Sequence, residues 1–348
     1  MKLYVTGSTG FVGSHVVAAA TARGHDVAAV VRPARSTVPE PAEQRTGDGP
    51  VGSVDPVRVD LRSRRGLAES LDGADAVIHL AAAKAGDFAT QFAGTVMATE
   101  NLLGAMTEAG VGRLVAISTF SVYDYLNTRP GTLIDEQAPI DRSPALRDEY
   151  AQTKLLQEEL YREFGASADT RLVILRPGMI YGEHNLWHAL LGAEFGPRFL
   201  RIGNSATLPL TYVENCAEAM VLAAERLGEP DDPIDGEVIN LVDDDLPTQR
   251  TYADLVAAAV ETPPSIPIPW PVIRTAAGAL KAGNQALLGG RAKFPGIAVP
   301  DRLHARFKPL RYTNAKAKRL LGWQPRYGLA EAIRRSAAAE AGTGQADR

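Results

Sequence analysis

A tyrosine and a lysine four residues apart could form an acid/base pair. Tyr150 and Lys154 stand at the ends of the stretch Tyr-Ala-Gln-Thr-Lys, which has helical composition. Residues at i and i+4 lie on one face of a helix, so the hydroxyl and the ammonium can point into the same cleft. The cation favours the phenolate and predicts a lowered pKa for Tyr150, which suits acid/base catalysis. Because this spacing also arises by chance, the interpretation needs a cofactor and a polarising group elsewhere in the chain.

A glycine-rich turn near the N-terminus predicts the cofactor. An apolar strand over 3–5 leads into the turn, and a segment of helical composition over 14–23 follows. Glycines in this setting allow a tight turn, close approach of the backbone to a pyrophosphate, and close packing of helix on strand. The phosphates would lie at the helix N-terminus, where N–H groups are free. The sequence therefore predicts a dinucleotide site formed by Gly7, Ser8, Thr9, Gly10, Phe11, Val12 and Gly13.

The end of the second strand, over 25–31, indicates which dinucleotide binds. An acidic residue there usually binds the ribose hydroxyls of NAD, whereas arginine accommodates the 2′-phosphate of NADP. This chain has Arg32, Arg35 and Ser36 in that region and no acid. The pattern favours NADP. NAD stays open, because Arg32 could instead stack on the adenine.

Alternating strands and helices predict the architecture. Further strands are expected over 57–59, 74–80 and 114–117, with helices over 67–71 and 89–109. This alternation is typical of an α/β fold, a Rossmann doubly wound parallel sheet with right-handed crossovers. Ligands bind at the carboxyl ends of such strands. There we expect cofactor contacts from Asp60, Leu61, Leu80, Ala81 and Ala82, a substrate-oxygen contact from Thr119, and further substrate contacts from Ser121 and Tyr123.

Taken together, these motifs resemble the extended short-chain dehydrogenase/reductase superfamily over nearly the whole chain. Its glycine motif, its Ser/Thr before Val-Tyr and its Tyr-x-x-x-Lys match the residues above, and the stretches 175–182 and 315–325 resemble its downstream signatures. The resemblance implies that Thr119, Tyr150 and Lys154 are catalytic, that Lys154 also binds the nicotinamide ribose, and that Pro177 flanks the nicotinamide.

One position departs from the pattern of that superfamily. Its members often have an asparagine in the long helix that steadies the proton relay through a water molecule. Aligned on Thr99 and Asn101, that position is Thr95 in this chain. The relay would then use the threonine hydroxyl or another water path, and Asn101 is interpreted as structural.

The second half of the chain is expected to hold the substrate lobe. We assign residues 1–180 to the Rossmann domain, with 212–245 returning to it, 181–211 and 246–340 to a smaller C-terminal lobe, and 341–348 to a frayed tail. His184 and Asn185 begin the lobe and are candidate substrate contacts. His184 and His188 have a metal-ligand spacing but no evident third ligand, and Cys216 is the single cysteine, so no metal site is predicted.

The segment Tyr212-Val213-Glu214-Asn215 resembles the hydroxysteroid dehydrogenase branch, and Val31-Arg32 the dihydroflavonol reductase branch. Both imply hydride transfer between NAD(P) and an apolar alcohol or ketone. One alternative is a nucleotide-sugar epimerase or dehydratase with tightly bound NAD. A second is a non-catalytic NAD(P)-binding regulatory protein, although such relatives usually lose the tyrosine or the lysine.

Composition limits the setting and the partners. The 348 residues carry a net charge of −4, and neither a leader segment nor an apolar run of spanning length is evident, which predicts a cytoplasmic protein.

A basic run over 291–326 contains one acid, Asp301, and is interpreted as a solvated face, although a phosphorylated substrate stays open. It lacks interleaved aromatics, so no nucleic-acid binding is predicted. An apolar face over 272–288 is expected to pack on the protein itself, with membrane contact unfavoured, and a homodimer stays open.

Overall fold

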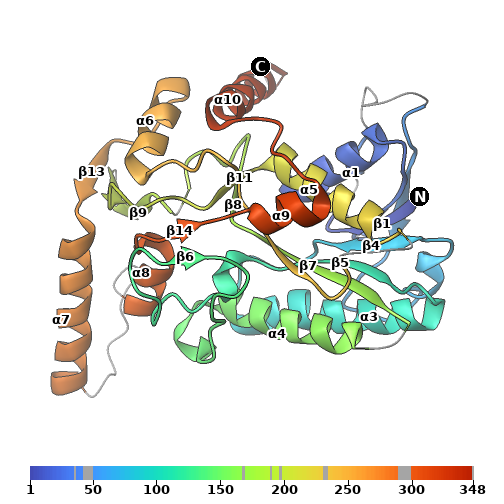
Figure 1. The fold of residues 1–348 in the computed structure, drawn as a ribbon, viewed down its shortest axis with the longest axis horizontal. Coiled ribbons are helices and arrows are strands. Elements are labelled where there is room, and N and C mark those ends of the chain that lie inside the picture. The colour runs from blue at the N-terminus through green and yellow to red at the C-terminus, as the bar shows by residue number, and fades with distance from the viewer. Residues whose placement is uncertain are drawn as a thin grey trace.

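A seven-stranded parallel sheet forms the centre of the molecule (Figure 1). A computed structural model describes residues 1–34, 37–41, 50–166, 169–188, 190–195, 198–229, 234–288 and 299–346. The strand order is β12-β7-β5-β4-β1-β2-β3, with every neighbouring pair parallel. The strands are β1 (Lys2–Thr6), β2 (Asp26–Val31), β3 (Val54–Arg58), β4 (Ala76–His79), β5 (Arg113–Ile117), β7 (Arg171–Pro177) and β12 (Val238–Leu241). This order confirms the predicted doubly wound Rossmann fold.

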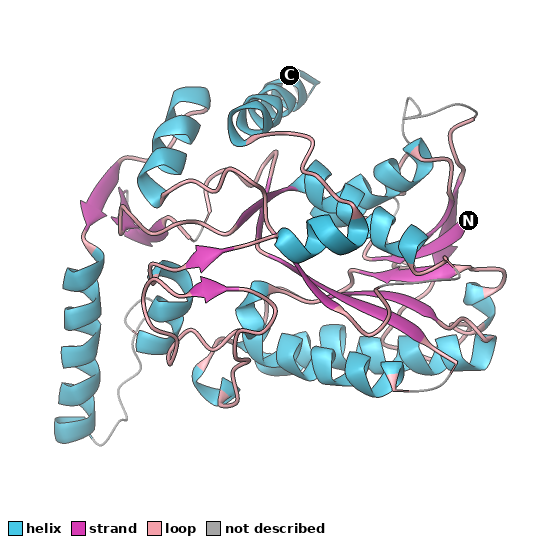
Figure 2. Ribbon diagram, in the orientation of Figure 1, coloured by secondary structure: helices cyan, strands magenta, loops and turns pink. Residues whose placement is uncertain are grey.

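Helices cover both faces of this sheet, as Figure 2 shows. One face carries α1 (Phe11–Ala22), α5 (Val213–Arg226) and α9 (Ala315–Leu321), and the other carries α3 (Ala98–Ala109) and α4 (Glu149–Gly165). Successive side chains of β1 alternate between the two cores: Leu3 and Val5 belong to the first, and Tyr4 to the second. Both faces of the strands are therefore buried, which explains their nearly continuous apolar sequence.

The long helix predicted over 89–109 contains an irregular turn. It consists of α2 (Phe88–Phe92), a π-helical segment (Ala93–Met97) and α3, and it ends at Gly110, whose φ is 70°. Gly94 lies in the π segment, and a Cβ there would come within 2.8 Å of the Ala83 Cβ. The π segment thus lies directly against the loop that follows β4, at the carboxyl end of the sheet.

The remaining elements surround the carboxyl edge of the sheet. They form three small sheets: β9 (Gly192–Phe195), β10 (Arg198–Ile202) and β13 (Ser265–Ile268); β8 (Met179–Tyr181) with β11 (Leu210–Tyr212); and β6 (Leu133–Ile134) with β14 (Arg311–Tyr312). The helices here are α6 (Gln249–Ala259), α7 (Trp270–Leu288), α8 (Pro300–Phe307) and α10 (Leu329–Ala346). The short 3₁₀ helices Phe120–Val122 and Pro144–Leu146 lie on this side too, whereas Glu69–Leu71 precedes β4 near the amino end of β1.

Helix α7 stands away from the central sheet (Figure 1). Trp270, Ile273 and Ala277 belong to a small core with residues of α8, but Leu280 and Leu287 are 46% and 84% exposed. The expectation that its apolar residues pack on the protein is therefore confirmed on one side of the helix and wrong on the other. Within the described ranges, no helix is long and apolar enough to cross a membrane.

Two other expectations need correction. The helix predicted over 67–71 is only the 3₁₀ turn Glu69–Leu71, because Leu67 and Leu71 anchor a short connection in the core rather than one face of an α-helix. The tail expected to fray from residue 341 continues α10 as far as Ala346. Its Ala-rich sequence extends the helix despite the two glycines in it.

Candidate functional site

The glycine turn between β1 and α1 has the form of a phosphate cradle. The Gly10 N–H donates to the Gly7 carbonyl at 2.9 Å, and Gly7 has φ of 68°, a region that favours glycine. A Cβ on Gly13 would lie 2.1 Å from the Gly7 oxygen. Gly10 caps α1 without a side-chain hydrogen bond, so no side chain covers the first N–H groups of the helix. The turn therefore leaves N–H groups free at the start of α1, and its binding of a dinucleotide pyrophosphate stays a prediction.

Neighbouring residues form the walls of this site. The Ser8 hydroxyl donates to the Val30 carbonyl at 2.7 Å and fixes the turn against β2. Leu80, Ala81 and Ala82 follow β4 and are partly buried, while Arg32 after β2 is exposed. Arg35 and Ser36 lie outside the described residues.

Asp60 and Leu61 follow β3 closely. The Asp60 carboxylate accepts hydrogen bonds from Arg62, and Leu61 is buried. Asn101 donates to the Leu61 carbonyl at 3.0 Å, in keeping with its interpretation as structural. Hydrogen bonds from Arg62 and Asn101 therefore fix the conformation of the Asp60–Leu61 turn.

Tyr150 and Thr119 come together at the carboxyl end of β5. Asp148 caps α4 by accepting from the Ala151 N–H, which places Tyr150 in the first turn of the helix. Thr119 precedes the 3₁₀ turn Phe120–Val122, and its side chain lies near enough to Tyr150 to lower the pKa of the phenol. Two hydroxyls from separate parts of the chain thus lie near each other, as the binding of one substrate oxygen would require.

The pKa of Tyr150 differs from the expectation drawn from the spacing. Burial of the hydroxyl raises it, the hydrogen bond from Thr119 lowers it by less, and Asp148 raises it further. The lysine does not offset these effects, because its own ammonium is directed to other partners. The prediction of a lowered pKa for Tyr150 is therefore wrong for the protein without ligands.

Lys154 lies one helical turn further along α4, on the inner side. It is 3% exposed, and its Nζ donates to the Ile117 carbonyl at 2.6 Å and to the Gln157 side-chain oxygen. Burial lowers the pKa of Lys154 to about 7, Glu158 opposes this change, and Lys84 adds to it. A pKa near neutral makes the charge of Lys154 sensitive to its neighbours.

A buried ion pair lies beside this lysine. The Glu158 carboxylate accepts from the Arg176 guanidinium and from the Ser118 hydroxyl, and both charged residues are at most 2% exposed. Burial acts to raise the pKa of Glu158, but Arg176 and Ser118 outweigh it and keep the carboxyl below its usual range. Arg176 also donates to the Tyr123 hydroxyl at 3.2 Å. The pair joins α4 to β5 and β7 directly beneath the catalytic residues.

The four proposed substrate contacts lie in different settings. Ser121 is partly exposed beside Thr119, with 3.4 Å between their side-chain oxygens. Tyr123 is 1% exposed and donates to Asn240, so we leave it out of the substrate site. His184 has φ of 59° and lies with Asn185 on the loop after β8, where the Asn185 amide donates to the Ile180 carbonyl.

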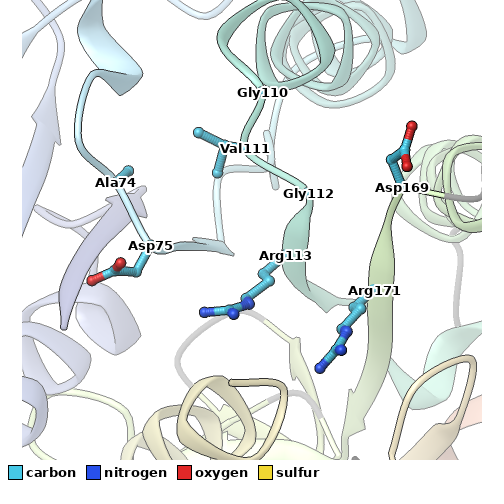
Figure 3. Close-up of a pocket in the computed structure, with 8 residues that line it drawn as sticks. All are labelled: Ala74, Asp75, Gly110, Val111, Gly112, Arg113, Asp169 and Arg171. Atoms are coloured by element: carbon cyan, nitrogen blue, oxygen red, sulfur yellow. The ribbon is translucent and has the colours of Figure 1, made fainter. Parts of the chain in front are cut away.

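No cluster of three metal-binding side chains occurs among the residues that the structure describes. A cavity of ≈ 340 Å³ lies at the amino ends of β5 and β7, the edge opposite Thr119 (Figure 3). Arg113 and Arg171 line it, and Arg171 is already bonded to the Leu227 and Glu229 carbonyls. This cavity is separate from the catalytic residues.

The fold and the site together define an NAD-dependent enzyme of the extended short-chain dehydrogenase/reductase type. More narrowly, the chain belongs to the NAD dependent epimerase/dehydratase family, whose model matches residues 3–241.

Relatives of this chain include a ketoreductase, sterol dehydrogenases and a 4-epimerase of an undecaprenol-linked sugar. It is 30% identical to a 4-hydroxy-2-methyl-3-oxo-4-farnesyl-3,4-dihydroquinoline-1-oxide ketoreductase of Stigmatella aurantiaca, over 94% of this chain and 92% of that protein. It is 27% identical to the human decarboxylating sterol-4-alpha-carboxylate 3-dehydrogenase, over 95% and 86%. The fold matches the UDP-glucose-4-epimerase from Stenotrophomonas maltophila with bound NAD, with a TM-score of 0.72, 21% identity and 99% of both chains covered.

Sequence reasoning missed three buried residues around Lys154. Gln157 and Glu158 follow it by three and four positions on the same helix, and His79 ends β4. A glutamine and a glutamate on the inner face of a helix were a usable signal, because buried polar groups require partners. His79 offered no such signal, since its partners come from distant segments.

Proposed function

We propose that this enzyme transfers a hydride between NAD(P) and the alcohol or ketone carbon of an apolar substrate. The observation that carries the proposal is that the Thr119 and Tyr150 side chains lie close together, with the buried Lys154 one helical turn along α4. It supplies two groups that can bind one substrate oxygen, with a titratable cation next to them.

The cofactor, when bound, supplies the hydride acceptor or donor at nicotinamide C4. The glycine turn would hold its pyrophosphate, Pro177 would flank the nicotinamide, and Lys154 would bind the nicotinamide ribose. Arg32, exposed at the end of β2 with no acid close by in sequence, supports NADP over NAD.

The protein residues handle the proton and the substrate oxygen. Thr119 orients the oxygen by a hydrogen bond, and Tyr150 gives it a proton during reduction or takes one during oxidation. The raised pKa of Tyr150 favours the protonated phenol, so the free enzyme is ready for reduction. Lys154 in its charged form stabilises the phenolate that remains.

Several observations support an apolar substrate. The named ketoreductase and sterol dehydrogenase act on farnesyl-quinoline and sterol substrates. The basic run gives little support to a phosphorylated substrate, because the lysines in its described part, 299–326, are used within the protein. Lys308 donates to three backbone carbonyls, Lys316 pairs with Glu237, and Lys318 pairs with Asp244.

Epimerization or dehydration of a nucleotide sugar is the second candidate, and the fold shared with UDP-sugar epimerases favours it. An epimerase would retain NAD through purification and need none added. The first test is therefore to measure dinucleotide bound to the purified protein. The second is to follow NADPH and NADH oxidation with apolar ketones, with UDP-sugars as the comparison. Bound NAD together with conversion of a UDP-sugar would overturn the proposal.

A substitution then tests the chemistry. Tyr150→Phe should lower turnover by about 10²- to 10⁴-fold, the range of general acid/base catalysis. Cofactor affinity, measured by NADPH fluorescence, should stay close to that of the wild type. Tyr327→Phe is the matched control, because that ring packs under Arg335, on the α10 side of the molecule. Retained activity in Tyr150→Phe would show that this tyrosine is not the acid/base group.

The same assays test the alternative of a regulatory protein, which would bind NADPH and turn over none of the substrates. Light scattering would test the homodimer that the sequence left open.

A further inference from the structure

We propose that Gln157 is a positioning residue that holds the Lys154 ammonium in place and in its charged form. The inference rests on the proposed function of Lys154 and adds a residue to it. Gln157 is 0% exposed, and among the described residues its amide oxygen is the one side-chain acceptor that the Lys154 ammonium contacts. The other partner of the ammonium is the backbone carbonyl of Ile117.

The hydrogen-bond directions around Gln157 are fixed by chemistry. A lysine ammonium only donates, so the amide oxygen of Gln157 must face it, and the amide nitrogen then faces Thr99 at 2.7 Å. The Thr99 hydroxyl donates to the Thr95 carbonyl at 2.7 Å and so accepts from Gln157. Reversing the amide would place its nitrogen against the ammonium and its oxygen against an acceptor. Gln157 therefore has one usable orientation.

The same reasoning extends to His79. Its Nε2 lies 2.9 Å from the Thr99 oxygen, whose proton is already used, so Nε2 carries the hydrogen and donates. Its Nδ1 then accepts from the Thr6 hydroxyl at 2.6 Å. The histidine is neutral in this arrangement, and burial lowers its pKa to about 3. Gln157 is thus supported by a fully buried network with defined donors and acceptors.

This network ends at the cofactor cradle. Thr6 is the last residue of β1 and directly precedes Gly7, and its oxygen accepts from the Ala81 N–H at 3.2 Å. The chain from Lys154 through Gln157, Thr99 and His79 to Thr6 therefore connects the catalytic lysine with the turn that would hold the pyrophosphate. Thr95 takes another role, since its hydroxyl accepts from the Ala83 N–H at 3.0 Å.

Loss of this acceptor should discharge the lysine. Burial already favours the neutral amine and Glu158 opposes it, while the Gln157 oxygen accepts a hydrogen bond directly from the ammonium. Gln157→Met keeps a similar volume and removes the acceptor. Gln157→Glu keeps the acceptor and adds a negative charge. The two variants should therefore move the protonation of Lys154 in opposite directions, which a merely structural glutamine would not do.

The experiment is an NMR titration of lysine side chains labelled at Cε, on the full-length protein without added cofactor or substrate. Lys154→Arg assigns the signal by its disappearance. Gln157→Met should lower the midpoint pH of Lys154 by about 1 or more, a tenfold change in protonation, and Gln157→Glu should raise it. Gln249→Met is the matched control, because that glutamine is also 0% exposed but bonds the Leu190 carbonyl. It should leave the midpoint unchanged.

The outcomes separate this proposal from the proposed function. Equal midpoints in the wild type and both Gln157 variants would overturn the positioning role, whatever the enzyme's substrate. Shifted midpoints in a protein that reduces no ketone would keep the positioning role and refute the reaction. If Gln157→Met does not fold, Gln157→Glu still decides, because an unchanged midpoint beside a new carboxylate would contradict the contact.

Discussion

Removing one partner of the buried ion pair between Glu158 and Arg176 should strongly destabilise the fold. The two side chains are 2% and 1% exposed, and Glu158 also accepts from Ser118. Glu158→Ala would leave the Arg176 guanidinium buried without a carboxylate. The expected loss is about 3–5 kcal/mol in the free energy of unfolding, the cost of an uncompensated buried charge.

A double variant distinguishes the pair's net contribution from that penalty. Replacing Glu158 and Arg176 together by methionine removes both charges and fills similar volume, so it should recover most of the loss seen in Glu158→Ala. Glu229→Ala is the surface control, because its pair with Arg226 has side chains 46% and 39% exposed. Breaking that pair should cost about 0–1 kcal/mol.

Equilibrium urea unfolding, followed in parallel by circular dichroism and tryptophan fluorescence, provides the measurement. Coincident curves would justify comparing free energies between variants. The reasoning fails if Glu158→Ala is as mild as Glu229→Ala. It also fails if the double variant is no more stable than the single one, since the cost would then come from lost packing rather than from an unpaired charge.

Two further predictions concern the glycine turn and acid stability. Gly13→Ala should cost about 1–3 kcal/mol in cofactor binding, or roughly 5- to 150-fold in Kd for NADPH, because its Cβ would lie 2.1 Å from the Gly7 oxygen. Gly104→Ala, with no atom within 4 Å of its Cβ in α3, should instead add up to about 1 kcal/mol of stability. Burial acts to raise the pKa of Glu225, but hydrogen bonds from His25 and Arg23 lower it to about 2. Its stabilising effect is therefore complete above pH 4.5 and lost as the pH falls toward 2, so Glu225→Gln should flatten the melting temperature across that range.

Local spacing predicted the parts of the site that lie close together in sequence. The glycine turn and the Tyr150–Lys154 pair each follow from the geometry of one element. Thr119 could be placed because the carboxyl ends of parallel strands share one edge, so its position on a strand determined its position in space. These inferences need no knowledge of side-chain partners.

Features that depend on distant partners could not be predicted in the same way. The pKa of Tyr150 is determined by burial and by Thr119, and neither effect follows from a lysine four residues away. The orientation of the Gln157 amide depends on its hydrogen bond to Thr99, which lies on a helix far earlier in the chain. In helix α7 the apolar residues could be identified from the sequence, but their exposure could not, because it depends on which other segments pack against the helix.

The strand order also has a consequence for synthesis on the ribosome. β12 pairs with β7 at one edge of the sheet, yet the segment from β8 to α5 lies between them in the chain. Until residues 238–241 emerge, the apolar strand β7 is an open edge that can pair with other chains. The backbone hydrogen-bonding groups of β7 therefore stay unpaired on one side while the ribosome synthesises the segment from β8 to α5. Growth temperature and chaperone supply should then affect its yield more than the stability of the finished fold would suggest.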